Sequence, residues 1–393
     1  MIYKGRFIFT EEPVRITVRD TRIAAVEPLV DSYDLPYISP GFIDMQVNGY
    51  KGNDYSLEGF SPQHLRHILH ELASSGVTQH LPTLISAPQP RMLKTLGVIA
   101  GQRAAHRDVA HAIPGIHLEG PCISGEDGPR GVHDPTVLRD PDIAEFEEWQ
   151  EAADGHISMI TLAPERRGAL KFIEYISEAG VIAAIGHSAA EPELIREAVA
   201  AGAQFSTHLG NGSHAQLPRL HNYLWEQLAA DELRAGIISD GFHLPASVVK
   251  TLSRAKGLER LVLVSDAALL GGLRPGIHTW GNLDVQVYED GHLGLAGTKF
   301  LAGAGHLLDW DIVQFMRFTG HNLSESIRLC TVNPAALLKF SPGKEALKVG
   351  APADLTIFRT QPGARALHIL KTISHGIEVY NHASELSEEN ACE

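Results

Sequence analysis

Cysteine is scarce in this chain. The three cysteines, Cys122, Cys330 and Cys392, lie far apart and form no Cys-x-x-Cys pair. This spacing excludes a disulfide framework and a zinc site built from closely spaced cysteines. It fits a reducing compartment, so we expect a cytoplasmic protein.

Long apolar runs and clusters of basic residues are also missing. No apolar stretch reaches the roughly 18 residues that a membrane-spanning helix needs. The chain begins directly with the strand-like segment MIYKGRFIF, so we expect no signal peptide. The formal net charge is -14, with no run of Lys and Arg. We therefore expect neither a membrane nor a nucleic acid as partner, and a small molecule as substrate.

The chain does contain a regular alternation of strand-like and helix-like stretches. Hydrophobic residues make up 44% of the 393 residues, which is enough for a large core. Eight segments have the pattern of a buried strand: 42–46, 79–84, 112–118, 157–163, 181–185, 204–207, 235–239 and 261–265. This alternation predicts an α/β fold, a closed (β/α)8 barrel of the TIM type over residues 39–340.

Both ends of the chain depart from this alternation. Residues 1–38 alternate apolar and polar side chains, and strand patterns return after residue 353. Such alternation is typical of antiparallel strands. We expect 1–38 and 341–393 to form a small β-sandwich domain outside the barrel, with a frayed acidic tail from 384. The Gly-rich insertion between Asp266 and Leu307 predicts a hairpin beside the barrel mouth.

Several predicted strands end in a residue that can bind a metal or move a proton. The third strand ends in Glu119, followed by a Gly-Pro turn. The fifth and sixth end in His187 and His208, and the eighth in Asp266. Because the C-terminal ends of barrel strands meet at one rim, we expect these side chains to lie together. One carboxylate and two imidazoles are suitable ligands for zinc, which keeps a position open for water in catalytic sites.

A plainer interpretation exists for each of these residues. A buried carboxylate paired with two core histidines would give the same pattern. An aspartate at a strand end, such as Asp266, can simply cap the next turn. We favour a metal site because three separate strands point their ends to one rim.

Short segments across nearly the whole chain resemble a known family. They are PGFIDMQVNG (40–49), HLEGP (117–121), GVHDP (131–135), GHS (186–188), THLGNG (207–212), SDGFH (239–243), SDA (265–267), LAGT (295–298) and VGAPADLTIF (349–358). In this order they resemble the amidohydrolase superfamily and, within it, the N-acetylglucosamine-6-phosphate deacetylases. The resemblance implies one divalent metal ion, which we expect to be zinc, and a homodimer.

The resemblance also implies catalytic roles. Glu119, His187 and His208 match the family's metal ligands, and Asp266 matches its acid/base. Asp266 would take a proton from the attacking water and pass it to the leaving amine. His243 matches a histidine that hydrogen-bonds the substrate carbonyl. An exposed loop histidine is the plainer interpretation of His243.

Other positions match the family's substrate contacts. Besides His243, they are His133, Asn211, Gly212, Arg219, Leu295, Ala296 and Gly297. A guanidinium such as that of Arg219 can bind a phosphate through two N–H donors, although a solvated arginine would suit the same position. The segment 125–130 and the surroundings of Arg219 depart from the family pattern.

The first strand carries Gln46 and Asn48 where many superfamily members have His-x-His. Family members with this Gln-x-Asn version bind one metal ion. The two amides orient the water, mark a vacated second metal position, or are satisfied polar residues in the barrel mouth; the sequence leaves these three alternatives open.

The expected activity is metal-dependent removal of the N-acetyl group from an amino sugar, N-acetylglucosamine 6-phosphate, giving the amine and acetate. Deacylation of another N-acyl amine, such as an N-acyl amino acid or a sugar without phosphate, is the alternative. A cyclic-amide hydrolase is disfavoured because no strand end offers a bridging lysine. A catalytically inactive, ligand-binding barrel is the alternative of another class.

Overall fold

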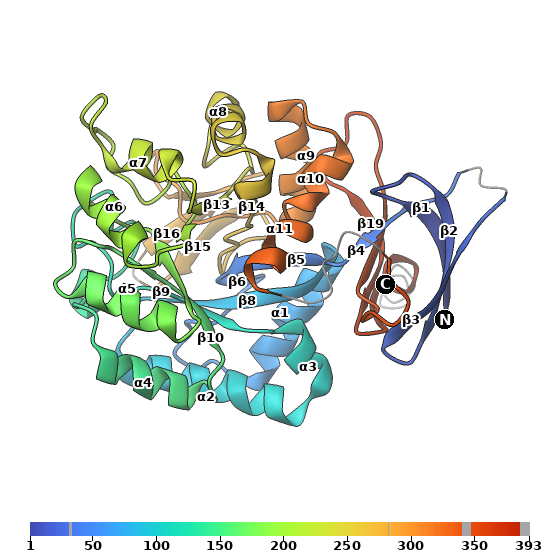
Figure 1. Ribbon diagram of the computed structural model, residues 1–393, viewed down its shortest axis with the longest axis horizontal. Helices are drawn as coiled ribbons and strands as arrows, with labels where there is room; N and C mark the ends of the chain where they lie inside the picture. Colours follow the sequence, from blue (N-terminus) through green and yellow to red (C-terminus); the bar gives the residue numbers. More distant parts are fainter. Residues whose placement is uncertain (31–33, 282, 340–346, 386–393) are drawn as a thin grey trace.

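The computed structural model describes residues 1–30, 34–281, 283–339 and 347–385 (Figure 1). Eight parallel strands follow one another around a barrel, which confirms the predicted (β/α)8 fold. They are β5 (Phe42–Val47), β8 (Val77–Ile85), β9 (Ile116–Glu119), β10 (Ile157–Leu162), β11 (Ile182–Ile185), β12 (Phe205–Ser206), β13 (Arg234–Ile237) and β14 (Leu261–Leu263). Each overlaps one predicted segment. The third begins later than predicted, because Ala112 is the last residue of a short helix.

The barrel closes where β5 meets the residues that follow β14. The amide of Asp266 donates to the carbonyl of Gln46 at 2.9 Å, and the amide of Asn48 donates to the carbonyl of Ala267 at 3.0 Å. These backbone hydrogen bonds bring the first and last strands together at their C-terminal ends. The side chains of Gln46, Asn48 and Asp266 therefore share one part of the rim.

Helices cover the outside of the barrel. They are α1 (Pro62–Ser74), α2 (Gln89–Ala105), α3 (Arg107–Ala112), α4 (Ile143–Ala152), α5 (Ala169–Glu178), α6 (Pro192–Ala200), α7 (Tyr223–Ala229), α8 (Ala246–Lys256), α9 (Leu308–Thr319), α10 (Leu323–Arg328) and α11 (Val332–Leu337), with 3-10 turns at Pro135–Val137 and Leu258–Arg260. Helix α1 shows why these segments are helical, since Leu65, Ile68 and Leu72 fall on one buried face at helical spacing. None of the described helices combines the length and apolarity needed to cross a membrane.

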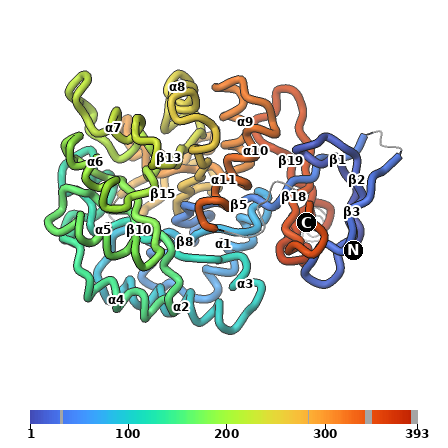
Figure 2. Tube along the Cα trace, viewed as in Figure 1, coloured from blue at the N-terminus to red at the C-terminus, as the bar shows by residue number. Residues whose placement is uncertain are grey.

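The two ends of the chain meet in one small β domain beside the barrel, as predicted, and its strands belong to a single sheet. Its seven strands run in the order β20-β19-β18-β4-β1-β2-β3. They are β1 (Ile2–Phe7), β2 (Pro13–Arg19), β3 (Arg22–Pro28), β4 (Tyr37–Pro40), β18 (Leu355–Arg359), β19 (His368–Ser374) and β20 (Ile377–Asn381). The N-terminal and C-terminal parts of the trace lie together at one side of the barrel (Figure 2). The predicted domain boundary at 340/341 and most of the predicted frayed tail fall outside the described residues.

The insertion after Asp266 forms a three-stranded antiparallel sheet, which we call the rim sheet. Its strands are β15 (Gly276–Trp280), β16 (Leu283–Val287) and β17 (Leu293–Leu295), where the sequence predicted a hairpin. Val285, Val287 and Leu293 pack on the segment Ala268–Leu270, which directly follows Asp266. The rim sheet is therefore anchored at the mouth of the barrel. A second, two-stranded piece, β6 (Gly49–Tyr50) with β7 (Asn53–Asp54), follows β5.

Candidate active site

Glu119, the last residue of β9, lies at the centre of a buried cluster. Its Oε1 atom is 3.1 Å from Nε2 of His187 and 2.9 Å from Nε2 of His208. The two imidazole nitrogens are 3.0 Å apart. All three side chains are buried. The structure thus brings together the three predicted metal ligands, each from the end of a different strand.

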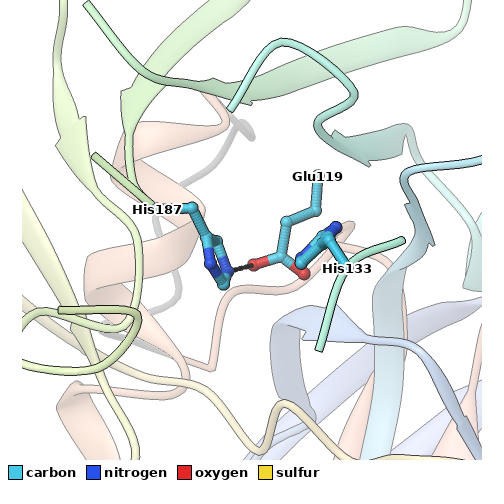
Figure 3. Close-up of side chains that lie close together, drawn as sticks. All are labelled: Glu119, His133 and His187. Atoms are coloured by element: carbon cyan, nitrogen blue, oxygen red, sulfur yellow. Dashed lines mark hydrogen bonds and ion pairs between the residues drawn. The ribbon is translucent and has the colours of Figure 1, made fainter. Parts of the chain in front are cut away.

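His133 lies beside this cluster, next to Glu119 and His187 (Figure 3). One ligand atom from each of these three residues lies within 4.8 Å of the other two, so His133 is also near enough to bind a metal ion. However, Nδ1 of His133 faces the Ser86 hydroxyl at 2.8 Å and accepts from the Ser86 amide at 3.4 Å. A neutral ring whose Nδ1 accepts carries its proton on Nε2. His133 is therefore better suited to donate a hydrogen bond to a substrate than to bind a metal.

His187 has the opposite arrangement. Its Nδ1–H donates to the carbonyl of Pro129 at 2.8 Å, so the lone pair is on Nε2 and points to Glu119. This is the usual way in which a protein fixes the tautomer of a metal-binding histidine. With a carboxylate oxygen and a second imidazole within about 3 Å, the donor set fits a divalent ion with nitrogen and oxygen ligands.

Gln46 and Asn48, at the end of β5 and just after it, lie beside the cluster of Glu119, His187 and His208. Nε2 of Gln46 donates to Oε1 of Glu119 at 2.8 Å. The buried acceptors Oε1 of Gln46 and Oδ1 of Asn48 have no hydrogen-bond partner among the described residues. Buried acceptors of this kind normally bind water or an ion. This speaks against the third alternative, in which the two amides are satisfied polar residues, and is compatible with both a water and a second metal position.

Three of these residues share an unusual backbone conformation. The φ angles are 51° at His187, 29° at His208 and 49° at Asp266. For residues other than glycine this left-handed region costs about 1–2 kcal/mol each. Such strain tends to occur at functional sites, where the surrounding structure holds it. Its presence at three strand ends of one rim indicates that the positions of these side chains are maintained despite the conformational cost to the backbone.

Asp266 lies at the same rim and is partly buried. Its Oδ1 accepts a hydrogen bond from Nδ2 of Asn48 at 2.7 Å. Burial, together with the negative charge of Glu119, raises the pKa of Asp266 to about 6. A carboxylate with a pKa near neutrality can both accept and return a proton, which is what a general acid/base requires.

His243 is held by Asp240, a residue whose role the sequence analysis missed. Nδ1 of His243 donates to Oδ2 of Asp240 at 2.8 Å, and the amides of Phe242 and His243 donate to Oδ1 at 2.8 and 2.9 Å. Burial raises the pKa of Asp240, but these hydrogen bonds outweigh it and the pKa lies below its usual value. The carboxylate therefore stays ionised and leaves Nε2 of His243 free. The Asp-x-x-His spacing of residues 240–243 was the available signal.

A cavity of about 670 Å³ joins these side chains. Its lining includes Glu119, His133, His187, His208, Asn211, Gly212, His243, Asp266 and Leu295. Most predicted site residues thus surround one space. Two cationic side chains, Arg130 and Lys299, line it as well.

The structure does not bring Arg219, Ala296 and Gly297 to the lining of this cavity. Arg219 is exposed and lines a neighbouring groove instead. The reason is the path of the chain before α7. The Asn222 side chain caps that helix, accepting from the amides of Leu224 and Trp225, and also donates to the carbonyl of Pro218. This compact turn holds Arg219 away from the metal ligands.

Two imidazoles and a carboxylate at the rim of a (β/α)8 barrel, with a further carboxylate beside them, define the class of metal-dependent hydrolases. The sequence model of the Amidohydrolase family matches residues 37–383. The chain belongs to this family, as its motifs predicted.

Similar proteins have more specific names. The N-acetylglucosamine-6-phosphate deacetylase of Bos taurus is 33% identical over 346 residues, which cover 84% of this chain and 82% of the bovine protein. The N-acetylgalactosamine-6-phosphate deacetylase of Escherichia coli O157:H7 is 29% identical over 371 residues, 91% of this chain and 96% of that protein. A mutant N-acetyl-D-glucosamine-6-phosphate deacetylase of Mycobacterium smegmatis has been solved in complex with N-acetyl-D-glucosamine-6-phosphate. Its structure matches with a TM-score of 0.85 at 28% identity, covering 97% of this chain and 99% of that chain.

Proposed function

We propose that this protein hydrolyses the N-acetyl amide of N-acetylglucosamine 6-phosphate and releases acetate. The observation that carries the proposal is the convergence of Glu119, His187 and His208 within 3.1 Å of one another, on the rim that also holds Asp266. The names of the similar proteins support the choice of substrate.

Glu119, His187 and His208 would hold one divalent ion, zinc in our proposal. The chemistry that zinc supplies when bound is a lowered pKa of water, to roughly 7, and polarisation of the amide carbonyl. Gln46 and Asn48 orient the attacking water through their free oxygens.

Asp266 moves the proton. Asn48 holds Oδ1, so we assign proton transfer to the second oxygen, Oδ2. Asp266 accepts a proton as the water oxygen bonds to the carbonyl carbon. It then gives that proton to the nitrogen as the C–N bond breaks, leaving a free amine and acetate.

His243 stabilises the negative charge that develops on the carbonyl oxygen, by donating a hydrogen bond from Nε2. Because Nδ1 already donates to the Asp240 carboxylate, a donor at Nε2 requires the doubly protonated ring. The negative charge of Asp240 stabilises this form and keeps the ring oriented. His133, with its proton on Nε2, and Asn211 contact the sugar.

We assign the phosphate to Arg130 and Lys299 rather than to Arg219, because these two cations line the cavity. Arg130 pairs with Asp127 in the same loop. The Asp127 side chain is 92% exposed, so water screens this pair and it contributes little. The guanidinium can therefore exchange Asp127 for a phosphate, to which it can donate two parallel hydrogen bonds.

We further propose a homodimer in the cytoplasm. Leu220 is 78% exposed and Trp225 is 49% exposed, and Trp225 lines the groove next to α7 and α8. Exposed apolar groups gathered in this way mark an association surface. The small number and wide spacing of the cysteines support a reducing compartment.

The direct test is acetate release from a panel of N-acetyl compounds by the zinc-loaded protein. N-acetylglucosamine 6-phosphate should be preferred over N-acetylglucosamine by at least about tenfold in kcat/KM, since a hydrogen bond to a charged group is worth about 1.5–3 kcal/mol. N-acetylgalactosamine 6-phosphate belongs in the panel because the Escherichia coli relative is named for it. Preference for an N-acetyl amino acid would refute the proposal that N-acetylglucosamine 6-phosphate is the substrate. Sugar binding without acetate release would indicate an inactive binding barrel.

A further inference from the structure

Five aromatic rings form a continuous stack beside the cavity. Tyr288 stacks on His292, with 4.0 Å between ring centroids and 6° between planes. His292 stacks on Phe242 at 4.6 Å and 20°. Phe242 lies against His306 at 5.8 Å and 15°, and His306 stacks on Trp310 at 4.0 Å and 6°. We call these five residues the ring stack.

The ring stack joins three separate parts of the chain. Tyr288 and His292 belong to the turn between β16 and β17 of the rim sheet, Phe242 follows β13, and His306 and Trp310 lie at the start of α9. The rim-sheet turn approaches His306 closely at Gly291. A Cβ on Gly291 would lie 2.7 Å from Cε1 of His306, so any larger residue at 291 would separate them.

Two residues of the ring stack, Phe242 and Trp310, connect it to the turn that carries His243. Phe242 precedes His243 directly and lines the cavity. The indole Nε1–H of Trp310 donates to the carbonyl of Asp240 at 3.0 Å. The carboxylate of the same Asp240 holds the His243 ring. The turn 240–243 is thus held by the stacked Phe242 ring and by the indole hydrogen bond.

We propose that the ring stack is a positioning device, which docks the rim sheet on the turn 240–243 and thereby fixes where His243 meets the substrate carbonyl. The proposal rests on the proposed function, in which His243 hydrogen-bonds that carbonyl. Catalytic groups must be held within about 0.5 Å of their working positions, so even a small rotation of this turn reduces the rate. The rim sheet then acts as more than a wall of the cavity.

His292 is the best position for a test, since its ring stacks on both Tyr288 and Phe242. Its Nδ1 also interacts with Oδ1 of Asp290 at 2.5 Å. His292→Ala removes the ring and this interaction, whereas His292→Phe removes only the interaction. Comparing the two variants isolates the stacking. His278→Ala on β15 is the matched control, because His278 is a histidine of the same sheet that donates to the carbonyl of Arg274 outside the ring stack.

We expect His292→Ala to lower kcat by about 5-fold or more, since two aromatic contacts of 0.5–1.5 kcal/mol each sum to at least about 1 kcal/mol. Its KM and zinc content should stay those of the parent. His292→Phe should restore kcat, and His278→Ala should match the parent. In a His243→Ala background, His292→Ala should cause no further loss, because its effect passes through His243.

Hydrogen exchange supplies a readout independent of turnover. In His292→Ala, the amides of 240–243 and 288–292 should exchange faster together, while His278→Ala leaves them unchanged. If the parent releases no acetate, the proposed function fails, and the exchange result still decides whether the ring stack holds the turn. The proposal is overturned if exchange at 240–243 is unaffected, if His292→Phe loses as much activity as His292→Ala, or if the losses of His292→Ala and His243→Ala are additive.

Discussion

Gly212 places a metal ligand by being small. Its φ is +53°, and a Cβ built there would lie 2.8 Å from Nδ1 of His187 and 3.0 Å from Cε1. Nδ1 is the atom that donates to the carbonyl of Pro129 at 2.8 Å. Gly212→Ala should therefore push the His187 ring away from Pro129 and turn Nε2 away from Glu119.

Two effects of different size follow. The left-handed backbone costs an alanine about 1–2 kcal/mol of folding free energy. Loss of the hydrogen bond that orients a metal-binding histidine typically lowers metal affinity by about 10–100-fold. Gly155→Ala separates the two, since Gly155 has φ +72° but nothing within 4 Å of its built Cβ.

The assay is zinc affinity by competition with a chromophoric chelator, beside thermal unfolding of the metal-free proteins. Both variants should unfold at lower temperature than the parent, and only Gly212→Ala should also bind zinc 10–100-fold more weakly, in keeping with the role of the Pro129 hydrogen bond. If Gly212→Ala binds zinc as tightly as Gly155→Ala does, then either His187 is no ligand or its orientation is not held as described.

Three further predictions concern turnover. Asp266→Asn keeps an acceptor for Asn48 but removes the proton carrier, so kcat should fall about 10³-fold with zinc retained; a loss below about tenfold would exclude Asp266 as the shuttle. In the parent, kcat/KM should decline as the pH falls through about 6, because burial raises the pKa of Asp266 to about 6 and only the ionised carboxylate is the base. A bound metal ion would move this decline to lower pH. An acidic limb that persists in Asp266→Asn would assign the decline to another group. Arg130→Gln should raise KM for the phosphorylated sugar by about tenfold or more and leave the unphosphorylated sugar unchanged, as expected for one lost charged contact; equal losses on both would show that Arg130 does not bind the phosphate.

The barrel and the residues of its rim could be predicted because local pattern was sufficient. An apolar run that ends in Glu119, His187 or His208 identifies a buried strand and its last side chain together. The topology of a parallel barrel then brings these ends to one rim, whatever the loops do. The short helix α10 was missed, although Asn322 and Glu325 form a capping box that signals a helix start.

Contacts that depend on loop paths could not be predicted in this way. Arg219 has the right spacing from His208, but the Asn222 cap of α7 holds its turn away from the cavity. Arg130 lies in a segment with no periodic pattern, yet it lines the cavity. The ring stack joins residues from Phe242 to Trp310, and nothing in the spacing of five separate aromatic residues predicts that their rings meet.

The central claim is that one metal ion, held by Glu119, His187 and His208, is required for deacetylation. The most direct test is to titrate zinc into chelator-treated protein and to measure acetate release from N-acetylglucosamine 6-phosphate at each addition, with Glu119→Gln as the control. Activity should start near zero and reach its maximum at about one equivalent, since the Gln46 and Asn48 pair replaces a second set of histidine ligands, and Glu119→Gln should need far more zinc. Activity that survives chelation, or that rises further with a second equivalent, would contradict the account.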